Sequence, residues 1–169
     1  IRLYYERVAP EDVNSASVED LYSAAMSLRK FAARRAAKGP KIRVVNPDAA
    51  ADGWRTGHTV IEIVNDDMPF LVDSITQGLN GAGFAVDLAV HPILRVKRSA
   101  AGRLTDLAMD LAPIKGYADE SWMHISIARQ TSAQALKEIE NTLARILADV
   151  RAAVDDWKPM LARLHETIT

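Results

Sequence analysis

The segment from His58 to Arg98 constrains the fold of this chain more than any other, because two kinds of hydrophobic pattern alternate within it. Residues 59–64 (TVIEIV) are β-branched and apolar, as in a largely buried strand. Residues 71–79 then place apolar side chains four apart, on one face of a helix that glycines end. Among residues 86–96, apolar and other side chains alternate again, and the apolar ones are expected to lie on one side of a second strand. The segment therefore predicts a strand–helix–strand unit. Its apolar residues are Leu71, Ile75 and Leu79 in the helix, and Val86, Leu88, Val90, Leu94 and Val96 in the second strand.

An acidic turn joins the first strand to the helix, and it is the candidate ligand site. Its residues are Asn65, Asp66, Asp67, Met68, Pro69 and Phe70. We expect Asp67 to cap the helix, because a carboxylate accepts the free backbone N–H groups at a helix start, and Pro69 is tolerated in the first turn. A helix start also favours an anion such as an amino-acid carboxylate. Two acidic side chains beside it would repel that anion, so capping is the favoured interpretation of the turn.

Further elements surround this unit. Ser17 is expected to cap a helix of about 20 residues, and residues 41–45 (KIRVV) predict a strand. Residues 120–128 predict another strand, and a long helix with an apolar stripe follows it. We expect Lys158-Pro159 to interrupt this last helix, since proline removes a helical hydrogen bond. In the strand over 120–128, Met123, Ile125 and Ile127 are expected to face the core, and Trp122, His124 and Ser126 to face away from it.

This order of elements predicts an α+β protein. It matches the split β-α-β arrangement of the ferredoxin-like fold: an antiparallel sheet of about four strands with helices on one face, plus an N-terminal helix and a long C-terminal helix. The strand over 41–45 is expected to supply the missing sheet edge, with a dimer partner as the alternative source. Residues 1–47 would form the N-terminal helix and edge strand. Residues 48–169 would form the core and its helical extension, the two parts making one compact unit.

Composition and charge restrict the class of protein. The chain has 169 residues, a formal net charge of −1 and no cysteine, which excludes disulfides and thiolate metal sites. No overall charge attracts nucleic acid or an anionic membrane. The four histidines form no metal-binding pattern, and no phosphate-binding loop or nucleophilic serine motif is present. We therefore expect no catalytic residue, metal or cofactor in this chain, a cytoplasmic location, and neither nucleic acid nor membrane as partner.

Several stretches, taken in order, resemble one family. They are YYERV, DLYSAAMSLRKFAARR, RVVNP, DGW, HTVIEIVNDDMPFLVDSI, VHPILRVKR and DVRAAVDDWKPM. Together they resemble the N-terminal region of the large NAD-specific glutamate dehydrogenases, a region similar to an ACT domain. ACT domains are small ferredoxin-like modules that sense amino acids or mediate oligomer contacts. The resemblance implies a parent enzyme that uses NAD to deaminate L-glutamate oxidatively to 2-oxoglutarate and ammonia. It implies a non-catalytic regulatory or oligomerisation role for this ACT-like fragment.

One departure from the family bears on ligand binding. Amino-acid-binding ACT domains commonly carry a glycine at the start of the first helix, where this chain has the bulky Phe70 and a proline that removes a donor. The departure favours assembly over sensing of an amino-acid effector. The implied partners are downstream domains of the parent chain and further copies in a homo-oligomer. Trp157 is the candidate interface residue, because the last helix is longer than a four-stranded sheet requires.

Three alternatives stay open at this point. The first is a free-standing amino-acid-sensing or interaction module without a catalytic parent. The second is an enzyme with a site hidden between the sheet and the loop over 103–119, which is long enough to act as a lid. The third is an RNA-binding module, which would need aromatic side chains on exposed strands, where only Trp122 is available.

Overall fold

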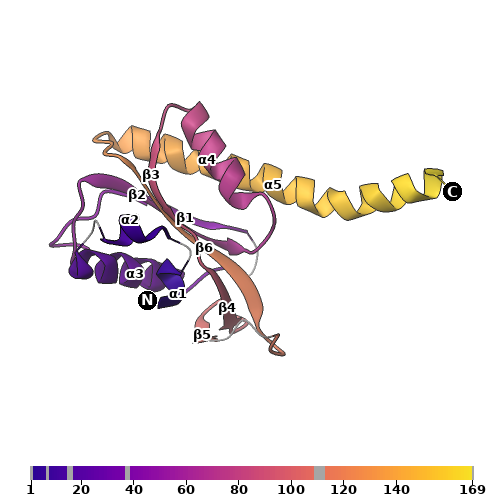
Figure 1. Ribbon diagram of the computed structural model, residues 1–169, viewed down its shortest axis with the longest axis horizontal. Helices are drawn as coiled ribbons and strands as arrows, with labels where there is room; N and C mark the ends of the chain where they lie inside the picture. Colours follow the sequence, from indigo (N-terminus) through magenta and orange to yellow (C-terminus); the bar gives the residue numbers. More distant parts are fainter. Residues whose placement is uncertain (1, 7, 15–16, 37–38, 109–112, 169) are drawn as a thin grey trace.

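The structure is a computed structural model, and it describes residues 2–6, 8–14, 17–36, 39–108 and 113–168. Three layers are visible in Figure 1: a central sheet, helices α4 and α5 on one face, and helices α1 to α3 on the other. The elements in chain order are α1 (Arg2–Tyr5), α2 (Pro10–Asn14), α3 (Val18–Ala32), β1 (Lys41–Val45), β2 (His58–Asp66), α4 (Leu71–Gly81), β3 (Val86–Val90), β4 (Ile93–Arg98), β5 (Leu104–Leu107), β6 (Ala118–Ala128) and α5 (Ala133–Ile168). The α+β prediction is therefore confirmed.

The sheet is antiparallel and runs in the order β1-β2-β6-β4-β5, with β3 also beside β6. The long strand β6 lies at the centre of the sheet. One of its edges pairs with β3 along one half, for example Val90↔His124, and with β4 along the other half, for example Ile93↔Ser121. The sheet therefore has more strands than the four expected. Strand β1 pairs with β2 and supplies the edge from the N-terminal side, as predicted.

The first core lies between the sheet and helices α4 and α5. The predicted helix face is confirmed, because Leu71, Ile75 and Leu79 are at most 2% exposed. Opposite them, α5 contributes a stripe at spacings of three and four, which covers the sheet. The buried residues of the stripe are Ile139, Leu143, Leu147 and Val150.

A second core lies on the opposite face, under α3, and it corrects the prediction for β6. Trp122, His124 and Ser126 were expected to face away from the core, but they are 2%, 4% and 9% exposed. Alternation along a strand correctly separates its two faces. It does not reveal that Leu28 and Ala32 of α3, almost a hundred residues away in the sequence, cover the second face.

The expected single-sided strand over 86–96 is also corrected. The register with β6 shifts between Val86 and Leu88, and an extra residue of this kind rotates the side chains that precede it. Val86 therefore packs against the first core, whereas Leu88 and Val90 belong to the second.

The two flanking helices differ from their predicted lengths. Ser17 caps α3 by accepting a hydrogen bond from the Asp20 N–H (3.1 Å), as expected, but the helix has 15 residues instead of about 20. Helix α5 is 36 residues long and includes Pro159 in its interior, so the predicted interruption was wrong. Proline removes a single helical bond there, and its acceptor belongs to the exposed residue Asp155, whose carbonyl can bond to solvent.

Candidate functional site

The predicted ligand turn lies between the end of β2 and the start of α4. Phe70 precedes the helix with a left-handed backbone (φ 70°), and its side chain is 59% exposed. The helix start has no side-chain cap, so the capping role predicted for Asp67 was wrong. A cap must directly precede the helix, and Asp67 lies four positions before Leu71. Its backbone N–H donates instead to the carbonyl of Asp119 (3.0 Å).

Asp66 connects the two helical layers. Its carboxylate accepts one hydrogen bond from Arg35, after α3, and another from Arg151 of α5, at 2.8 and 2.7 Å. Burial raises the pKa of Asp66, but the hydrogen bonds and charges of the two arginines outweigh burial and hold that pKa below its usual value. The positive charges of Arg35 and Arg151 therefore offset the negative charge of Asp66, which was one of the two carboxylates expected to repel a bound anion.

Asn65 is the buried polar residue of the turn. Its side chain is 1% exposed, and neither its amide nitrogen nor its amide oxygen has a hydrogen-bond partner among the described residues. Buried amides are normally hydrogen-bonded. However, residues 65–70 line neither of two cavities that the described part of the structure contains. Ligand binding at this turn therefore stays a prediction.

Glu120 lies at the centre of a buried ion cluster. Its carboxylate accepts hydrogen bonds from Arg35 (2.9 Å), from Arg98 (2.7 and 2.8 Å) and from the indole N–H of Trp122 (2.9 Å). Burial raises the pKa of Glu120, but these donors and charges outweigh it and hold the pKa below its usual value. The cluster joins α3 to β4 and β6. Trp122 is buried in this cluster, so it is not accessible for stacking on a base, which the RNA-binding alternative would require.

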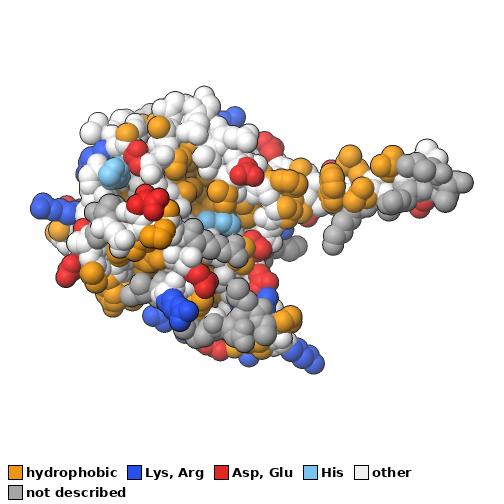
Figure 2. Space-filling view, viewed as in Figure 1, with side chains coloured by type: hydrophobic (Ala, Val, Ile, Leu, Met, Phe, Trp, Pro, Cys, Tyr) orange, Lys and Arg blue, Asp and Glu red, His pale blue; other side chains and the backbone are white. Residues whose placement is uncertain are grey.

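The far half of α5 projects beyond the body of the molecule (Figure 1) and carries apolar side chains on its surface (Figure 2). Trp157, the predicted interface residue, is 55% exposed. It stands in line with Val154, Leu161 and Leu164, at the spacings of three and four that the buried part of the same helix uses. The apolar stripe of α5 therefore extends past the end of the sheet that it covers.

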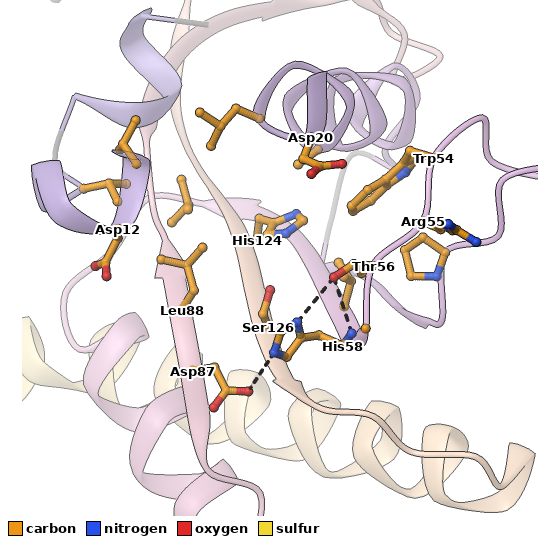
Figure 3. A pocket seen from close by; sticks show the side chains of 18 of the residues that line it. Asp12, Asp20, Trp54, Arg55, Thr56, His58, Asp87, Leu88, His124 and Ser126 are labelled. Carbon is orange, nitrogen blue, oxygen red and sulfur yellow. Dashed lines mark hydrogen bonds and ion pairs between the residues drawn. The ribbon is translucent and has the colours of Figure 1, made fainter. Parts of the chain in front are cut away.

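The structure contains a cavity that sequence reasoning did not predict. Its volume is about 860 Å³, and it lies between the N-terminal helices, the sheet and the loop before β2. His124 lies at its centre, below Trp54 and Asp20, as Figure 3 shows. Burial, with a smaller contribution from Arg43, lowers the pKa of His124 to about 4, so the imidazole is neutral at pH 7. The polar residues alternating with apolar ones along β6 were the only sequence signal for this site.

The described part of the chain shows neither a metal site nor a membrane span. No three histidine, aspartate or glutamate side chains there lie close enough together to hold a metal ion. None of the helices in the described ranges combines the length and apolar character that a membrane span requires. The loop considered as an enzyme lid includes residues 109–112, which lie outside the described residues.

Comparison with known proteins identifies the family. Residues 1–143 match the protein family described as "Glutamate dehydrogenase, ACT1 domain". The chain belongs to this family. Among relatives, the ACT1 domain described here is 37% identical to a NAD-specific glutamate dehydrogenase of Halomonas elongata and 31% identical to one of Pseudomonas aeruginosa, each over 98% of this chain. A third enzyme of that name, from Mycobacterium tuberculosis, is 28% identical over 63% of it.

This ACT1 domain spans about a tenth of the length of the first two relatives. The resemblance seen in the sequence is confirmed, and so is an ACT-like reading of the sheet with α4 and α5. Most of each relative lies outside the stretch that matches this domain.

Proposed function

We propose that this chain is a non-catalytic regulatory and assembly domain of a NAD-dependent glutamate dehydrogenase in the cytoplasm. The parent enzyme would deaminate L-glutamate oxidatively to 2-oxoglutarate and ammonia, with NAD bound by other domains. Family membership and the names of the relatives support this parentage. We also infer that residues 1–47 and 48–169 form one compact unit, because β1 pairs with β2 and α3 packs on β6.

The exposed stripe on the far half of α5 is the observation that carries the assembly role. Within this stripe, the exposed fractions of Trp157, Leu161 and Leu164 are 55%, 38% and 55%. Three large apolar side chains within eight residues form a contiguous patch, and such patches mark interaction sites. Tryptophan and leucine in this arrangement fit a contact with a helix or groove of a neighbouring domain of the parent chain. The same stripe could instead pair two copies, and the experiment below separates these cases.

A charge placed on the stripe tests this role. Trp157→Asp combined with Leu164→Asp is expected to abolish correct assembly of the full-length dehydrogenase, because two carboxylates would be desolvated in the contact. The isolated 169-residue chain should keep its melting temperature within a few degrees, since substitutions of exposed residues usually change stability by less than ~0.5 kcal/mol. Analytical ultracentrifugation and glutamate-dependent NAD reduction measure the two outcomes in the full-length chain.

The matched control is Ala152→Asp, which adds a carboxylate to the opposite, exposed side of the same helix. It should leave assembly intact. Loss of self-association by the isolated chain would assign the stripe to a second copy. Normal assembly and activity of the double variant would contradict the proposed role of α5.

Ligand binding at the acidic turn has a separate test. We expect no amino acid to raise the melting temperature of this chain through residues 65–70, because Phe70 occupies the position where amino-acid-binding ACT domains commonly carry glycine. A ligand at about 100 times its dissociation constant would add ~2.7 kcal/mol to the free energy of unfolding, which is a rise of several degrees. Thermal denaturation with each of the common amino acids measures it. A rise that Asn65→Leu abolishes would establish sensing at this turn.

A further inference from the structure

The cavity beside His124 lies on the face of the sheet opposite α4 and α5. We propose that it binds a small organic cation, with an ammonium group on an apolar or aromatic body. The site is separate from the acidic turn and from the exposed stripe of α5. Its volume, about 860 Å³, lies within the range of about 300–1,000 Å³ that is typical of small-molecule sites.

Two unpartnered polar groups point to a ligand. His124 is 4% exposed, and its Nδ1 has no hydrogen-bond partner among the described residues. The indole N–H of Trp54 is also buried without a partner in that part of the chain, and the two rings lie 6.1 Å apart. Both side chains line the cavity. Native proteins leave few such groups unsatisfied, so each of these two calls for a partner, which a bound ligand or a water molecule would supply.

The charges around the cavity select a cation. Among the described residues that line it, four carboxylates face two guanidinium groups, those of Arg55 and Arg129, and the imidazole of His58, which lies 3.6 Å from the Asp87 carboxylate. Arg129 already donates to the carbonyl of Thr56 (3.0 Å). The carboxylates are those of Asp12, Asp20, Asp48 and Asp87. An organic anion would enter a surplus of negative charge, whereas an ammonium group would be stabilised there.

The aromatic and apolar lining fits the same ligand. The aromatic rings of Trp54 and Tyr5 line the cavity, and ammonium groups are attracted to aromatic rings. The neutral imidazole of His124 has a lone pair that can accept a hydrogen bond from a cation. Apolar side chains also line the cavity, among them Val60 and Leu88, and they would hold the body of the ligand.

Three probes of similar size and different charge test the proposal: phenethylammonium, phenethyl alcohol and phenylacetate. Each is added at about 10 mM to the ¹⁵N-labelled chain, roughly ten times a millimolar dissociation constant. We expect phenethylammonium to shift the amide resonances of β2, β3 and β6 around His124, with an affinity about tenfold higher than that of phenylacetate. No shift, equal binding of the three probes or preference for phenylacetate would overturn the proposal.

Two variants locate the probe. Asp20→Asn should weaken phenethylammonium binding about threefold, because one surface carboxylate is lost, whereas Glu19→Gln, whose side chain does not line the cavity, should not change it. Leu21→Trp should fill part of the cavity and abolish binding, with an unchanged fold shown by circular dichroism. If Leu21→Trp fails to fold, the Asp20→Asn and Glu19→Gln pair decides. Equal affinity of that pair would overturn the proposal. None of these results bears on assembly through α5.

Discussion

Glu120→Ala is expected to lower the free energy of unfolding by about 3 kcal/mol, because it leaves buried guanidinium groups without their counter-charge. Arg35 is only 4% exposed and loses one of its two carboxylate partners. Arg98 loses both of its carboxylate contacts, and Trp122 loses the acceptor of its indole N–H. The loss should stay at the low end of the range for buried pairs, since Arg35 keeps Asp66. Urea denaturation measures it.

The neighbouring residue supplies the control. Asp119 makes a two-bond contact with Arg95, but its side chain is 40% exposed, so Asp119→Ala should cost less than ~1 kcal/mol. Equal losses for the two variants would show that the Glu120 cluster is not the buried connection between α3 and the sheet that its geometry indicates.

Mild acid is expected to destabilise the chain through His124. Its pKa is lowered from 6.5 to about 4 in the folded state, so the unfolded state binds the proton first as the pH falls. Stability is therefore full above about pH 6.5 and is lost progressively down to about pH 4, by about 3 kcal/mol in all. Denaturant titrations at successive pH values between 7 and 4 would record this slope.

His124→Gln separates this effect from that of the carboxylates. The lowered pKa values of Asp66 and Glu120 contribute stability above their unfolded values of 3.8 and 4.5, and this contribution is lost at lower pH. The free energy of unfolding of the variant should thus stay constant between about pH 6.5 and 4.5. In the native chain, His124 dominates the pH dependence of stability over this range. An unchanged slope in the variant would mean that His124 is protonated without cost in the folded state.

The sequence predicted those parts of the fold that local patterns determine. The apolar face of α4, the strand β2, the α3 cap at Ser17 and the edge strand β1 all follow from spacing and residue type. The errors occurred where a distant segment decides the environment. Polar side chains at Trp122, His124 and Ser126 suggested an exposed face, because a strand pattern reports polarity and not what packs against it.

The candidate sites were less accessible to sequence reasoning. Asp67 has the right residue type for a cap, but the left-handed backbone of Phe70 moves the helix start beyond its reach. The cavity is assembled from α1 to α3, the loop before β2, and strands β2, β3 and β6, so no single stretch carries its signature. Trp157 differs, since the length of the last helix already indicated a surface that the sheet does not cover.

Helix α5 is continuous from the part that covers the sheet to its projecting tip, so a small change of its orientation at the sheet is amplified at the tip. At 1.5 Å per residue, its 36 residues extend about 54 Å, and roughly 27 Å of this length lies beyond Val150. A tilt of about 5° at the sheet would displace the tip by about 2 Å. Helix α5 also packs closely against α4, because Gly78 of α4 has no side chain that would keep Ile146 of α5 at a distance. Force applied to the tip would therefore be transmitted along one continuous helix to the body of the domain.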